Sequence, residues 1–205
     1  MQKLTILVLI CFSLNACNSS KKTENGSTIS ETKPSKPALQ TETGRAALQK
    51  MMIPAHLWAA DVQPIHLESQ PSEESDGSDG KSAQWRSVWG SDSKRSAKSF
   101  SWSGSSTGDP NSRGITPGGE DSWSASNTSM QAFNFGFIKI DTDNALTVAQ
   151  GKLAPKDKAT KPVSYSLRFD PHENQLLWRV RFGEGDRFKT IDVDATTGKY
   201  VRTER

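Results

Sequence analysis

One motif in the sequence has the spacing of a serine nucleophile. Gly104, Ser106 and Gly108 fit the pattern G-x-S-x-G, in which a sharp turn from strand to helix exposes the serine hydroxyl for attack on a carbonyl. The next residues, 109–112 (Asp-Pro-Asn-Ser), favour a loop over the helix that this chemistry needs. Because a stretch rich in serine and glycine produces such matches easily, we predict no catalytic residue. A hydrolase that uses Ser106 remains an alternative.

The side chains that commonly bind metal ions are also poorly spaced. His56, His66 and His172 lie far apart in the sequence, and no HExxH motif occurs. The acidic loop 73–80 contains Gly77 and Gly80, but its glycine register and the missing terminal glutamate do not fit a calcium-binding EF-hand. We therefore predict no metal site and no cofactor.

A cysteine near the N-terminus is the strongest candidate for covalent modification. Residues 1–16 begin with Lys3 and continue with an apolar stretch too short to cross a membrane, which predicts a signal peptide. The following Leu14-Asn15-Ala16-Cys17 resembles a bacterial lipobox, in which the cysteine is acylated and becomes the new N-terminus. We predict lipidation, palmitate included, at Cys17. The alternative is an ordinary secretory signal with an incidental cysteine.

The predicted lipid anchor has consequences for the chain and its location. The other cysteine, Cys11, lies in the segment to be removed, so no disulfide is expected in the mature protein. Residues 17–43 comprise the acylated cysteine and a polar, flexible tether. The protein is expected in the cell envelope, attached to a membrane and facing the periplasm. Asn18, where some bacteria place an inner-membrane retention signal Asp, favours the outer membrane.

The C-terminal part of the chain has the clearest strand pattern. Apolar and polar residues alternate over 165–169 and over 176–182, and Asp170-Pro171 marks a turn between them. Shorter apolar stretches follow at 191–193 and 200–201. These segments predict an antiparallel β-meander. A helix over 141–153, with Asp141 or Asp143 as N-cap, is expected to precede the meander and pack on it.

This segment resembles a PepSY domain. The resemblance is carried by Trp178-Arg179-Val180 and by an ending with Val193-Asp194-Ala195, Thr197-Gly198 and Val201. It implies an α+β fold with one helix packed on a small antiparallel β-meander. It also implies a non-catalytic role, because similar domains inhibit or chaperone secreted peptidases or serve as envelope modules.

An internal comparison predicts a second, divergent copy of this unit upstream. Residues 85–90 align with 178–183, and an expected helix at 46–61 again comes first. The predicted organisation is a signal peptide at 1–16, the acylated cysteine and tether at 17–43, a first PepSY-like unit at 44–104, a Ser/Gly-rich loop or linker at 105–130, and a PepSY-like unit at 131–205. The apolar run 132–140 is expected to join or pack the two sheets. The alternative is a single C-terminal domain after loosely ordered chain.

Charge patterning provides one candidate surface for a partner. Loss of residues 1–16 removes Lys3 only, which leaves 25 basic and 23 acidic residues, a net charge of +2, so no nucleic-acid partner is indicated. Arg168, Arg179 and Arg181 are expected on the outer face of the meander, where they could receive an acidic partner, a phosphate head group or an envelope polymer. The alternative, which we favour, is a solvated face whose arginines pair with nearby acids.

Together these patterns predict a membrane-anchored envelope lipoprotein that acts as a non-catalytic protein-binding module. Its partner would be a peptidase, whose activity it would modulate, or another envelope component. The alternatives are an envelope hydrolase that uses the motif at 104–108, or a structural spacer.

Overall fold

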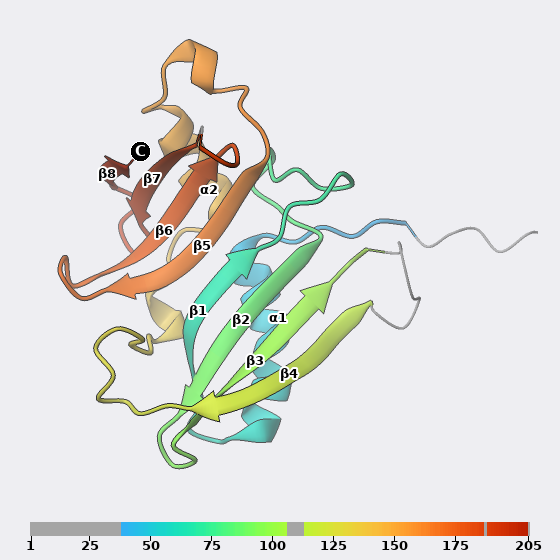
Figure 1. The fold of residues 1–205 in the computed structure, drawn as a ribbon, viewed down its shortest axis with the longest axis vertical. Helices are drawn as coiled ribbons and strands as arrows, with labels where there is room; N and C mark the ends of the chain where they lie inside the picture. Colours follow the sequence, from blue (N-terminus) through green and yellow to red (C-terminus); the bar gives the residue numbers. More distant parts are fainter. Residues whose placement is uncertain (1–37, 106–112, 187, 205) are drawn as a thin grey trace, which may run out of the picture. The chain divides into compact units, whose positions relative to one another are not determined.

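One antiparallel sheet of eight strands organises the protein, which is described by a computed structural model over residues 38–105, 113–186 and 188–204 (Figure 1). The strand order is β4-β3-β2-β1-β5-β6-β7-β8. The strands are β1 (Gln63–Ser69), β2 (Gln84–Ser91), β3 (Ser96–Ser103), β4 (Gly114–Ser122), β5 (Val163–Asp170), β6 (Gln175–Phe182), β7 (Lys189–Asp194) and β8 (Tyr200–Glu204). Figure 1 shows the helices α1 (Gly44–Trp58) and α2 (Thr142–Gln150) behind the sheet, so that neither of these described helices covers its other face.

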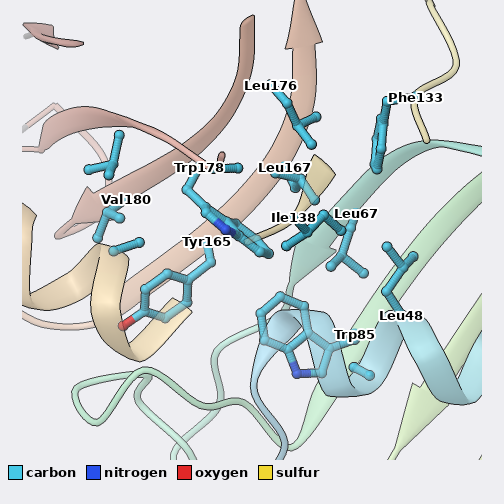
Figure 2. Packing of buried hydrophobic residues seen from close by; sticks show 14 of the residues in the cluster. Leu48, Leu67, Trp85, Phe133, Ile138, Tyr165, Leu167, Leu176, Trp178 and Val180 are labelled. Carbon is cyan, nitrogen blue, oxygen red and sulfur yellow. The ribbon is translucent and has the colours of Figure 1, made fainter. Parts of the chain in front are cut away.

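The hydrophobic core lies between the helices and the sheet. Helix α1 contributes Ala47, Leu48, Met51 and Ala55, which recur at helical spacing and are fully buried. Figure 2 shows Leu48 in the same cluster as Leu67 of β1, Trp85 of β2 and Trp178 of β6. The cluster continues across the whole width from β3 to β7, so the two halves of the sheet share one core.

The N-termini of the two helices meet and share a carboxylate. The side chain of Thr43, the N-cap of α1, caps no backbone group of its own helix. Instead Asp141 accepts hydrogen bonds from the Thr43 hydroxyl (2.5 Å) and from the Arg45 backbone N–H (2.8 Å). It also accepts from the backbone N–H of Thr142 (2.7 Å), at the start of its own helix. Because the first N–H groups of a helix lack partners within it, one aspartate here stabilises two helix ends.

A buried threonine extends this contact to a third segment. The hydroxyl of Thr142 donates to the carbonyl of Gly80 (2.5 Å) and accepts from the N–H of Gly44 (3.0 Å). Gly44 has no room for a side chain, because an added Cβ would overlap the ring of Trp178. The tight approach of α1 to β6 therefore depends on this glycine.

The expected fold class, a helix on a small antiparallel β-meander that is duplicated, is wrong. Strands β1 and β5 pair antiparallel, with His66 opposite Arg168 and Leu67 opposite Leu167, and this pairing joins all eight strands into one sheet. Alternating hydrophobicity predicts that a segment is a strand but does not specify its neighbour, which explains the error. The individual elements were predicted better. Strands β5 to β8 cover the expected segments, and Asp141 is the N-cap of α2.

Two further expectations concern the middle of the chain, and the first of them is wrong. The stretch 105–130, expected as a loop or linker, contains β4, which pairs with β3 along most of its length. Its strand pattern is hard to recognise because β4 is an exposed edge strand with Ile115 as its single aliphatic residue. The apolar run 132–140, expected to join or pack the two sheets, forms no strand and only a short 3-10 helix, η2 (Phe135–Phe137), but its Phe133 and Ile138 are buried in the core that both halves of the sheet share. The sheet is joined through β1 and β5 instead.

Candidate functional site

The sheet face without helices, here called the outer face, carries the three arginines proposed from the sequence. Arg168 lies on β5, and Arg179 and Arg181 lie on β6. On each strand these residues alternate with buried core residues such as Leu167 and Val180. The structure thus places all three on one face, but it gives them different surroundings.

Arg179 belongs to a network of charges that crosses four strands, β5 to β8. Its guanidinium forms a bidentate pair with Asp192 of β7, at 2.9 and 3.0 Å, and contacts Glu204 of β8 at 2.9 Å. Arg202 of β8 binds the same two acids, each at 2.9 Å, and also Asp170 of β5 at 2.7 Å. Asp192 is only 1% exposed. The network therefore ties the strands of this half of the sheet together and neutralises Arg179.

The protonation behaviour of these groups follows from their partners. The hydrogen bond from Arg202 lowers the pKa of Asp170, because it stabilises the carboxylate. The hydrogen bond to Asp192 raises the pKa of Arg179, because it stabilises the charged guanidinium. Asp170 and Arg179 are thus held in their charged forms.

Arg181 has a different environment. Its guanidinium carbon lies 3.9 Å from the ring centroid of Phe188, a cation–π arrangement. Its Nε is buried and has no hydrogen-bond partner among the residues that the structure describes. Arg181 therefore packs on an aromatic ring and does not join Arg168 in a common site.

Arg168 lies in a groove of about 780 Å³ on the outer face. We call this the outer groove. It covers the junction of β1 and β5, where Arg168 is opposite His66. Apolar and charged side chains line it together: Ile65, Val88, Met130 and Phe169 on the one hand, and Arg168, Arg179, Arg202, Asp170 and Glu204 on the other. His66 and His172, which are distant in the sequence, both line it as well.

One wall of the outer groove is formed by residues 128–131. Trp123, at the end of β4, packs on Ile65 and Ala97 in a small apolar cluster on the outer face. Its indole N–H donates to the carbonyl of Met130 (3.0 Å), and the N–H of Phe133 donates to the carbonyl of Pro64 (2.8 Å). These contacts fix both ends of the wall. Sequence analysis missed the wall because it placed these residues in a linker, although Trp123 was a signal of packed chain.

His66 also has a partner. Its Nε2 lies 3.2 Å from Glu68 on the same strand, and the hydrogen bond with His66 lowers the pKa of Glu68. Over the described ranges, no group of three or more histidine, cysteine, aspartate or glutamate side chains could hold a metal ion. The apolar and charged side chains that line the outer groove suit the binding of a ligand that is partly apolar and partly charged.

The remaining residues proposed from the sequence cannot be placed in this site. Cys17 and Ser106 lie outside the described residues. Gly104 and Ser105, at the start of the G-x-S-x-G motif, follow β3, and the Ser105 hydroxyl donates to Glu74 (2.8 Å). None of the helices within the described part of the chain is both long and apolar enough to cross a membrane.

Comparison with known proteins identifies one similar fold. A crystal structure of a protein from Clostridium difficile 630, described as a "putative lipoprotein", superposes with a TM-score of 0.52 at 11% sequence identity. The match covers 80% of this chain and 95% of that protein. At this identity the similarity concerns the fold alone. No family model matches the chain, and no curated protein matches it, so the resemblance to a PepSY domain gains no support from these comparisons.

Proposed function

We propose that this chain is a membrane-anchored envelope lipoprotein that binds another protein, without catalysis, through the outer groove. The observation that carries the binding role is the groove itself, in which an exposed arginine lies among apolar side chains. Its volume is within the range of about 300–1,000 Å³ that is common for ligand sites. A mixture of apolar surface with a few fixed polar groups is also typical of sites that select a partner.

The anchoring role rests on the N-terminal sequence. The lipobox-like segment ending at Cys17 and the polar stretch that follows it are the features expected of a lipid-anchored protein. The similar fold of a protein described as a lipoprotein agrees with this proposal. We place the protein on the periplasmic side of an envelope membrane, the outer membrane being favoured by Asn18. The partner would be an envelope protein, and a peptidase is one candidate.

Site-directed cross-linking in living cells tests both roles. A photoreactive amino acid is introduced in place of Ser129, which is exposed and lines the outer groove. The matched control places it at Gln49, which is exposed on α1 and therefore on the opposite side of the sheet. We expect one envelope protein to be captured from position 129 and not from position 49, and the capture to weaken in an Arg168→Glu background.

Two results would contradict the proposal. If both positions capture the same abundant proteins, the groove has no specific partner and a structural spacer becomes the better explanation. If the Cys17→Ala chain is still labelled by a palmitate analogue and remains in the membrane fraction, the anchor is not at this cysteine.

A further inference from the structure

The charges in the outer groove indicate the chemistry of its ligand. Arg179 and Arg202 are paired with Asp170, Asp192 and Glu204, as described above, and Arg202 also lies 3.5 Å from Glu173. Arg168 differs, because it is exposed and forms no ion pair with any residue that the structure describes. The acids of the groove, Asp170 and Glu204, are already engaged by Arg202. The arginines of the groove are matched by at least as many acids, so the groove carries no net positive charge, but Arg168 is the arginine of its described lining whose guanidinium is left to pair with a ligand.

The surroundings of this charge are partly apolar. On β6 the residue opposite Arg168 is Leu177, which is 3% exposed. On β1 the residue opposite Arg168 is His66, whose Nε2 already contacts Glu68. Beyond His66 on the same row lies Val88 of β2. A carboxylate that enters the groove would lose part of its water and meet a guanidinium that can bind it through two parallel hydrogen bonds. Ion pairs made in such partly dry surroundings are stronger than those on an open surface.

We propose that the outer groove binds an acidic segment of a partner protein, with an Asp or Glu carboxylate on Arg168 and a neighbouring apolar side chain against Ile65 and Met130. This inference rests on the proposed function, because it specifies the partner of the same groove. A polypeptide segment is favoured over a small anion, since apolar residues as well as the arginine line the groove. Complementary charge would provide specificity, and the apolar contacts would supply the larger part of the affinity.

Selection from a random heptapeptide display library tests this inference on the full chain without its signal peptide. We expect the selected peptides to be enriched in Asp or Glu next to an apolar residue. Replacing that acid with its amide in a synthetic peptide should weaken binding about tenfold or more, the usual effect of removing a charged hydrogen-bond partner. An Arg168→Glu chain should lose these peptides and select basic ones instead. The matched control, Lys156→Glu, makes the same change of net charge on the exposed η3 helix (Pro155–Asp157) and should select as the native chain does.

Hydrogen exchange in the presence of each peptide locates its binding site and separates the two proposals. Protection of residues 65–69, 128–131 and 166–169 by acidic peptides supports the inference. Protection of the same residues by peptides without acidic preference, or an unchanged preference in Arg168→Glu, overturns the acidic ligand and leaves the groove as a binding site. Failure of every peptide to protect these residues, or protection only by vesicles of anionic phospholipid, overturns both proposals. Circular dichroism confirms that each variant is folded.

Discussion

The sharing of Asp141 by two helix ends leads to a quantitative prediction. Substitution Asp141→Ala removes the acceptor for the Arg45 and Thr142 N–H groups and for the Thr43 hydroxyl. Loss of one N-cap costs roughly 1 kcal/mol, within a range of about 0.5–2 kcal/mol. Because two helices lose their cap at once, we expect the free energy of unfolding to fall by about 2–3 kcal/mol. At about 2–4 °C per kcal/mol, the melting temperature should fall by about 4–12 °C.

The measurement is urea unfolding followed by tryptophan fluorescence, with thermal unfolding as a second readout. The matched control is Asp143→Ala, which removes the same charge from the first turn of α2 but whose carboxylate bonds, among the described residues, to the neighbouring Asn144 alone. Asp143→Ala should lower the free energy of unfolding by the contribution of a charge near a helix N-terminus, about 0.3–1 kcal/mol. Asp141→Asn keeps one acceptor oxygen, so its loss of unfolding free energy should lie between those of Asp141→Ala and Asp143→Ala. Equal losses for Asp141→Ala and Asp143→Ala would show that only the charge matters and that the shared cap contributes nothing.

Two further predictions concern other parts of the fold. Hydrogen bonds from Ser91 and Ser93 lower the pKa of Asp61 from 3.8 to about 2. The carboxylate therefore stabilises the folded state fully above pH 3.8, and this contribution is lost as the pH falls toward 2. NMR titration should show this low pKa, and Asp61→Asn should make unfolding less dependent on pH between these values; an ordinary pKa near 4 would contradict the hydrogen bonding. Gly44→Ala should destabilise the fold by about 1–3 kcal/mol, because the added methyl group overlaps Trp178. Gly119→Ala, in open space on β4, is its control, and equal effects in urea unfolding would refute the role of close packing at Gly44.

Sequence patterns predicted segments of this fold more reliably than their arrangement. The alternation of apolar residues in β5 and β6 and the capping residue of α2 are local features, and local physics determines them. The pairing of β1 with β5 depends on residues far apart in the sequence, and no local pattern specifies it. Strand β4 was missed because an exposed edge strand is stabilised by backbone hydrogen bonds and needs few apolar side chains.

In the candidate site, too, the sequence predicted individual residues better than their arrangement in space. The sequence identified the outer-face arginines and the acids near them, because both lie on strands with clear alternation. It did not identify the outer groove, whose wall depends on the contact of Trp123 with Ile65 and on a hydrogen bond to Met130. It also did not distinguish Arg168 from Arg179, since the ion pairs of Arg179 form across strands.

The long-range junction at the centre of the sheet also has consequences for the kinetics of folding. The hairpins on either side of it close locally, whereas the junction pairs His66 with Arg168, 102 positions apart in the sequence. Closing so long a loop costs entropy before its contacts form, and folding rates fall as such non-local contacts increase. During synthesis, which starts at the N-terminus, β1 has β2 on one side but lacks its second neighbour until β5 has been made. Until then its open edge can pair with another chain, so a slow or interrupted chain is most prone to aggregate at this strand.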